Sequence, residues 1–150
     1  MRKTIKKIIH PGFYSDNINV VLLILRVVIG IFMLTHGVGK FQKLFGSDPI
    51  QFGDPLGVGI TTSLILAVFA EVFCSILIII GLGTRFAAIP LFVTMIVASF
   101  IVHINDDFSK QEFALLYALI FMTIATIGSG KFSLDYLISQ NRKSEFKNKN

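Results

Sequence analysis

The chain has 150 residues, of which 53% are hydrophobic and only 15% are charged, and its mean hydropathy is +0.74. A soluble domain of this length needs a more polar surface than this composition provides. The net charge of +5 is a surplus that nucleic-acid-binding proteins also show. Here, however, the basic residues flank apolar segments, so we expect no nucleic-acid partner.

Four apolar blocks follow one another along the chain, at residues 18–34, 60–82, 86–102 and 113–127. With its semi-polar flanks, each block reaches about 17–23 residues, the length that a tilted helix needs to cross a bilayer. Backbone polar groups in lipid must pair within their own segment, so we expect helices. The sequence predicts an all-α fold, a four-transmembrane-helix bundle over residues 18–138. A basic segment, 1–17, precedes the bundle, and a disordered basic tail, 139–150, follows it.

The basic residues are distributed unequally between the two sides of the predicted membrane. If both termini face the cytoplasm, ten of the fourteen basic residues lie on that side and three on the other, with Arg26 inside a span. This asymmetry follows the positive-inside rule. It predicts cytoplasmic N- and C-termini, a multi-pass membrane protein, and polybasic ends that contact anionic lipid headgroups.

The connections between the spans carry turn and capping signals. Residues 41–59 mix glycine and proline with aromatic side chains, so we expect a partial lid in the outer interface rather than a helix. The turn "GLGT" at 81–84 leads into the third span, with Thr84 as its expected N-cap. After the last span, Ser133 is expected to cap a short amphipathic helix.

Two oppositely charged residues fall within the spans. By helical rise, Glu71 lies near the midplane and Arg26 about 4.5 Å to its inner side. The first two spans are joined directly and run antiparallel, so they should be neighbours. We therefore predict an Arg26–Glu71 pair, which either clamps the bundle or handles protons and polarises a ligand.

Three further ionisable residues gather at a second depth near the outer face. His36 lies about 10 Å outward of the centre of its span, and His103 and Glu112 about 12 Å outward on theirs. Such a cluster inside the bundle can exchange protons with a small or quinone-like molecule, because histidine titrates near neutral pH. Two alternatives stay open. The three residues can simply cap helices at the rim, or they can bind a metal, although no tight H-x-x-x-H spacing supports a metal.

The remaining candidate binding residues are Lys40, Met33 and Cys74. Lys40 lies one turn beyond His36, and Met33 shares the inward face of the first span with Arg26. Cys74 is the single cysteine of the chain, so it forms no internal disulfide. A lone membrane cysteine is usually a packing residue.

Several motifs together resemble the DoxX family of small bacterial membrane proteins. They are "LR-x3-G-x5-HG-x2-K" in the first span, Glu71 in the second, "GLGTR" after it, His103, and the closing "GSGKFSLD". The matching positions are Arg26, Gly30, His36, Gly37, Lys40, Glu71, Arg85, His103, Gly128, Gly130, Ser133 and Asp135. The resemblance covers residues 22–138. It implies four membrane helices in a bacterial inner membrane and a place near redox metabolism, because relatives include a quinone-reducing small subunit of a thiosulfate oxidoreductase. Where relatives often carry glycines after the glutamate, this chain has Val72, Phe73 and Cys74, and we expect these larger side chains to narrow or reshape any cavity beside Glu71.

The leading functional hypothesis is a quinone-associated or redox-linked accessory subunit. Arg26, Glu71, His36 and His103 would do the chemistry, and Lys40, Glu112, Met33 and Cys74 would contact the ligand. The sequence has no haem, flavin or iron–sulfur ligation pattern, so a redox role requires a bound quinone or a partner protein that carries the cofactor. The alternatives are a small-solute or proton carrier, which would act as a homo-oligomer or by slight opening, and a non-catalytic scaffold.

Overall fold

The computed structural model describes residue 12 and residues 14–147, with side chains as far as Asn141. Most of the predicted basic segment 1–17 therefore lies outside the described residues. The helices are, in chain order, α2 (Asp16–Phe45), α3 (Ile60–Val68), η1 (Phe69–Cys74), α4 (Ser75–Ile80), α5 (Thr84–Val97), η2 (Ala98–Val102), α6 (Phe108–Ile127) and α7 (Leu134–Lys147). The two η segments are π-helical, and no strand occurs in the described part of the chain. The predicted all-α fold is confirmed.

Four helical rods are long and apolar enough to cross a membrane. α2 and α6 each form one rod, α3, η1 and α4 continue into one another over Ile60–Ile80, and α5 and η2 do so over Thr84–Val102. α2 runs to Phe45, well beyond the apolar block at 18–34, so Lys40 lies within a regular helix. The bundle of four membrane-spanning helices matches the prediction.

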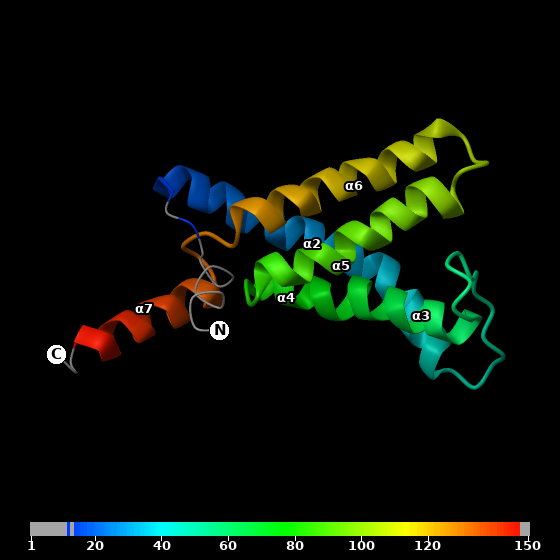
Figure 1. The fold of residues 1–150 in the computed structure, drawn as a ribbon, viewed down its shortest axis with the longest axis horizontal. Helices are drawn as coiled ribbons and strands as arrows, with labels where there is room; N and C mark the ends of the chain where they lie inside the picture. The colour runs from blue at the N-terminus through cyan, green and yellow to red at the C-terminus, as the bar shows by residue number, and fades with distance from the viewer. Residues whose placement is uncertain (1–11, 13, 148–150) are drawn as a thin grey trace.

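The rods lie side by side along the long axis of the molecule (Figure 1). α2 packs along α3, η1 and α4, which confirms that the first two rods are neighbours, and α5 packs against α6. The connections 46–59 and 103–107 lie at one end, which we call the loop end. The start of α2 and α7 lie at the opposite end, which we call the α7 end, and α7 projects away from the bundle there.

Apolar side chains cover the outside of the bundle as well as its core. Ile24, Phe73 and Leu119 are each more than half exposed although they lie within spans. Such a surface is expected to contact lipid rather than water. The interior is filled by apolar residues, including Ile29, Met33, Ala70, Cys74, Ile78, Ala88, Leu91, Phe121 and Ile124.

The turn between α4 and α5 lies where the sequence predicts it, but Thr84 is not the N-cap residue. Gly81 ends α4 with φ +72°, a conformation that glycine adopts without strain. Gly83, not Thr84, is the N-cap residue of α5, and Thr84 begins the helix. The capping acceptor comes from elsewhere in the chain: the Asp135 carboxylate accepts hydrogen bonds from the backbone N–H groups of Gly83 (2.8 Å) and Thr84 (3.1 Å).

α7 begins where the sequence predicts a helix. The backbone N–H of Tyr136 donates to Ser133 Oγ at 3.2 Å, which confirms Ser133 as a cap. The helix continues to Lys147, so the described residues are helical where we expected a disordered tail from residue 139.

Candidate functional site

The buried carboxylate of Glu71 is paired with Lys40. Lys40 Nζ donates to Glu71 Oε1 across the interface between α2 and η1. The Glu71 side chain is 2% exposed and that of Lys40 30% exposed, so the pair reaches from the core toward the loop end. Glu71 Oε2 is buried and has no hydrogen-bond partner among the described residues. One carboxylate oxygen is thus available to a further ligand.

Local backbone geometry places Glu71 in this position. Glu71 lies within η1, and π-helical turns inside α-helices are rare and frequent at functional sites. Opposite η1, Gly37 of α2 has no side chain to hold the helices apart. A Cβ added at Gly37 would lie 2.9 Å from the backbone carbon of Glu71 and 2.7 Å from Val72 Cγ2. The glycine therefore permits the close approach that joins Lys40 to Glu71.

The loop at 46–59 covers the loop end of this pair. The Phe52 ring lies beside Lys40, with Nζ 5.9 Å from the ring centroid. Asp54 fixes the far part of the loop: Oδ1 accepts from Ser63 Oγ at 2.7 Å, and Oδ2 accepts from the Gly59 N–H at 2.8 Å. The hydrogen bond from Ser63 is the main reason why the pKa of Asp54 lies below its usual value. The loop is ordered by its own contacts, with one aromatic ring directed at the ion pair.

The predicted Arg26–Glu71 pair is wrong. Arg26 is fully buried, but its Nη2 donates to the backbone oxygen of Phe132 at the α7 end, at 2.5 Å. Helical side chains lean toward the N-terminus of their own helix. Because α2 and the second rod are antiparallel, Arg26 leans toward the α7 end and Glu71 toward the loop end. The two side chains diverge, and each finds another partner.

Arg26 instead meets the segment that leads into α7. Its Nη1 lies against Gly81, at the position that a Cβ of that glycine would occupy. Ser133 Oγ bonds Ser129 Oγ at 3.0 Å and the Gly130 oxygen at 2.7 Å, so this segment is internally bonded as well. Arg26 is a packing and anchoring residue for the closing "GSGKFSLD" segment. Sequence reasoning named Asp135 as a motif position but missed its capping role, which no local pattern reveals.

The predicted His36, His103 and Glu112 cluster does not form inside the bundle. His36 is exposed, with its ring edge-on to Tyr117 at a centroid distance of 6.2 Å, and Glu112 is exposed on α6. His103 Nδ1 bonds Asp106 Oδ2 of its own loop at 2.6 Å, which holds the pKa of Asp106 below its usual value. His36 and Glu112 point outward from their helices, and His103 lies in the connection after η2, beyond the end of its rod. Within the described residues, no group of three or more His, Cys, Asp or Glu side chains is placed to hold a metal.

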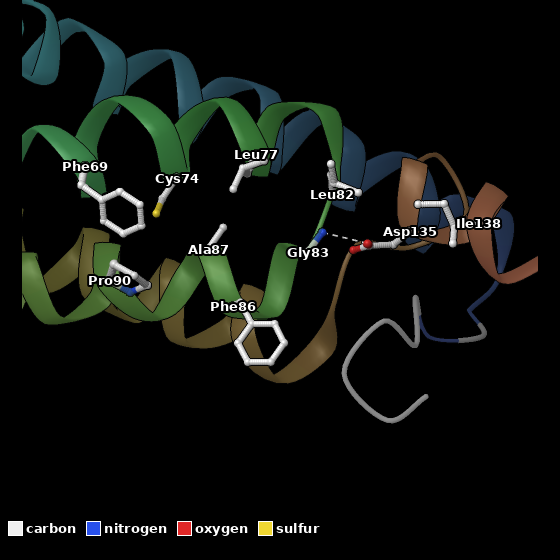
Figure 2. A pocket seen from close by; sticks show the side chains of 10 residues that line it. All are labelled: Phe69, Cys74, Leu77, Leu82, Gly83, Phe86, Ala87, Pro90, Asp135 and Ile138. Atoms are coloured by element: carbon white, nitrogen blue, oxygen red, sulfur yellow. Dashed lines mark hydrogen bonds between the residues drawn. The ribbon is translucent and has the colours of Figure 1, made fainter. Parts of the chain in front are cut away.

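Met33 and Cys74 are both core residues. Met33 is 1% and Cys74 2% exposed. Cys74 borders a groove of about 690 Å³ that runs between the second rod and α5 as far as α7 (Figure 2). The groove is almost wholly apolar, and its acidic residue, Asp135, is committed to capping α5. It offers space for an apolar chain but no free group for proton chemistry.

The fold and the site define a class: a helical membrane protein of four spans in which a lysine pairs with a buried glutamate at a π-helical turn. Comparison with known families places it more closely. The profile of the DoxX family matches residues 21–104, more than half of the chain. The chain belongs to the DoxX family.

Three relatives extend the match over most of the chain. A Bacillus subtilis protein named "Putative oxidoreductase CatD" is 31% identical over 123 residues, 81% of this chain and 90% of the relative. An uncharacterized protein of Haemophilus influenzae is 36% identical over 121 residues, 76% of this chain and 87% of the relative. An uncharacterized membrane protein of Mycobacterium tuberculosis is 26% identical over 136 residues, 79% of this chain and 82% of the relative. No solved structure matches significantly.

Proposed function

We propose that this DoxX-family protein is a redox-linked accessory subunit that binds a quinone at the Lys40–Glu71 pair and handles its protons there. The observation that carries the proposal is the state of Glu71. Its carboxylate is 2% exposed within a membrane-spanning rod, with Oε1 bound by Lys40 and Oε2 free of partners among the described residues. Ionisable groups at such positions are costly and mark ligand or proton sites.

The residues around Glu71 suit a quinone headgroup chemically. Lys40 supplies a cationic donor for a ring carbonyl, and Glu71 supplies a group that takes up or releases a proton. Phe52, already beside Lys40, supplies an aromatic face. A quinone carries electrons and protons and dissolves in lipid, so a site within a membrane-spanning bundle is accessible to it.

The electrons would come from a partner protein that carries a redox cofactor, since the chemistry of Lys40 and Glu71 is limited to protons and hydrogen bonds. The name of the Bacillus subtilis relative, an oxidoreductase, supports this assignment. Lys40 and Glu71 would hold the headgroup and exchange its protons. His36, His103 and Glu112 would have no part in the reaction.

Quinone binding by matched variants tests the proposal. The protein is purified in a mild detergent, extracted quinone is quantified, and a soluble quinone analogue is titrated. Glu71→Gln and Lys40→Met should each weaken binding roughly 10- to 100-fold, the equivalent of one charged hydrogen bond. Glu112→Gln removes an exposed carboxylate on α6 and should bind as the wild type does.

Two results would contradict the proposal. One is wild-type protein that binds no quinone and copurifies with no redox protein. The other is a folded Glu71→Gln variant with unchanged affinity. If the double variant Lys40→Met with Glu71→Leu kept its partners and its cellular phenotype, a scaffold whose ion pair only holds the helices together would be the better account.

A further inference from the structure

Buried polar atoms without partners gather at a single helix interface. In the described part of the chain they are Arg26 Nε, Arg26 Nη1, Ser75 Oγ and Glu71 Oε2. All three residues lie where α2 packs against η1 and α4. Buried polar groups are normally hydrogen-bonded, and an unmade bond is costly. These four atoms therefore have hydrogen-bonding capacity that the described part of the chain does not use.

The three residues form a row along the bundle axis. Gly37 faces Glu71, and a Cβ added at Gly30 would lie 3.2 Å from the backbone oxygen of Ser75. Arg26 Nη1 reaches Gly81, beyond the end of α4. Glu71 and Ser75 are four residues apart, about 6 Å along the helix axis. The order from the loop end to the α7 end is therefore Glu71, Ser75, Arg26.

The donor and acceptor types match a chain of water molecules. Arginine only donates hydrogen bonds, an ionised carboxylate only accepts them, and a serine hydroxyl does both. Water between them can accept from Arg26, bond Ser75 and donate to Glu71 Oε2. Buried waters typically make about three such bonds to otherwise unsatisfied groups.

We propose that bound water molecules link Arg26, Ser75 and Glu71 along this interface, and that the row carries protons between Glu71 and the α7 end of the bundle. The proposal gives the Glu71 site of the proposed function its proton supply and in that sense rests on it. At the loop end, the 30% exposed side chain of Lys40 already connects Glu71 with the outside of the bundle. The row therefore completes a route between the two ends.

Each transfer along the row is a proton exchange. A water molecule at the α7 end gives a proton to the next water. The Ser75 hydroxyl accepts a proton on its oxygen and releases its own proton toward Glu71. Glu71 Oε2 takes that proton, and the carboxyl group becomes neutral beside Lys40. No electron moves, so neither an oxidant nor a reductant is needed.

Proton flux into liposomes tests the route. Purified protein is reconstituted with a trapped pH-sensitive dye, and a potassium diffusion potential set with valinomycin drives protons inward. Wild-type protein should raise the flux above that of empty liposomes, and Ser75→Ala should lower this increment about tenfold, the rate equivalent of one lost hydrogen bond. Ser99→Ala is the matched control, because Ser99 is equally buried but its hydroxyl already donates to the Gln111 oxygen at 3.3 Å.

A second measurement detects the water itself and does not depend on conduction. Hydroxyl radicals generated by X-ray irradiation oxidise side chains next to bound water. Met33 lies on the α2 face between Gly30 and Gly37 and is 1% exposed, whereas Met95 of α5 is 8% exposed and lies off this face. Bound water should make Met33 the more reactive of the two, although simple exposure favours Met95.

The outcomes separate this inference from the proposed function. A wild-type flux equal to that of empty liposomes, or an unchanged flux in folded Ser75→Ala, overturns the route, and so does Met95 reacting faster than Met33. Quinone binding is measured on the same preparations. Binding that persists in Ser75→Ala while the flux falls supports both proposals, and flux without quinone binding removes the proposed function alone.

Discussion

Asp135 shows how one side chain can hold three segments together. Its carboxylate caps α5 through Gly83 and Thr84, and Oδ2 also accepts from the Thr84 hydroxyl at 3.1 Å. Its backbone N–H donates to the Gly81 oxygen at 2.9 Å, at the end of α4. The residue is 3% exposed, so water replaces none of these bonds easily. Asp135 therefore fixes the start of α7 to the turn between α4 and α5.

Replacing Asp135 should destabilise the bundle. Asp135→Ala removes the N-cap of α5 and should lower the free energy of unfolding by about 2 kcal/mol, the upper range for a lost cap. Asp135→Asn keeps one acceptor oxygen and should recover part of the loss. Asp16→Ala is the control, since exposed Asp16 makes only a surface ion pair with Lys131 at 3.3 Å, of a kind that contributes little. Thermal unfolding in detergent measures all three, and equal effects of Asp135→Ala and Asp16→Ala would contradict the capping role.

The sequence identifies Glu71 and Lys40 as candidate site residues, but it does not predict that they pair with each other. Composition and hydropathy alone identify Glu71 and Lys40 as ionisable groups in or beside spans. Depth along a helix was estimated from Cα positions, which ignores the lean of each side chain toward its N-terminus. On antiparallel helices that lean separates Arg26 from Glu71 and leaves Lys40 as the partner. Asp135 and Phe132 are distant in sequence from the groups they bond, so no local pattern could have assigned them.

At the scale of the helices, the Lys40–Glu71 contact requires that α2 packs closely on η1. The sequence predicted an inward face of α2 that carries Arg26 and Met33, and in the structure Gly37 and Gly30 of the same helix face η1 and α4. It did not predict the π-helical turns, because these arise from one extra residue per turn and leave no signature in hydrophobic periodicity. It also placed the end of the first span too early, because the amphipathic last turns of α2 resemble a loop in hydropathy.

Two glycines of α2 provide a matched test of this packing. Gly37→Ala forces a methyl group against the backbone of Glu71, so α2 and η1 must move apart and Lys40 must leave Glu71. We expect destabilisation of about 1–3 kcal/mol, typical of overpacking, together with weaker quinone binding. Gly39→Ala places its Cβ in open space and should be neutral or stabilising by up to about 1 kcal/mol. Thermal unfolding that ranks Gly39→Ala below Gly37→Ala would show that the interface tolerates the methyl group.

At the scale of the whole molecule, basic residues concentrate at the α7 end of the bundle and aspartates at the loop end. The α7 end receives the "GLGTR" turn, the "GSGK" segment and α7, all with basic residues, whereas the loop end carries Asp48, Asp54, Asp106 and Asp107. Among the residues that the structure describes, the segments at the α7 end carry Arg85, Lys131, Arg142, Lys143 and Lys147, and those toward the loop end carry Lys40, Lys43 and Lys110. Translocating basic segments is unfavourable, so the α7 end should face the cytoplasm. The site at Lys40 would then open toward the outer side, and the proton row would end on the inner side.

Cysteine labelling in intact cells tests this orientation. Cys74→Ala removes the single native cysteine, and one new cysteine is then placed at an exposed position of either end, by Asn105→Cys or Gln140→Cys. A membrane-impermeant maleimide added from outside, with the outer membrane made permeable if the cell has one, should label the Asn105→Cys protein. The Gln140→Cys protein should react only after lysis, because the bilayer separates it from the reagent. The reverse pattern would place the α7 end outside, and protons moving along the Arg26–Ser75–Glu71 row would then enter from the opposite side of the membrane.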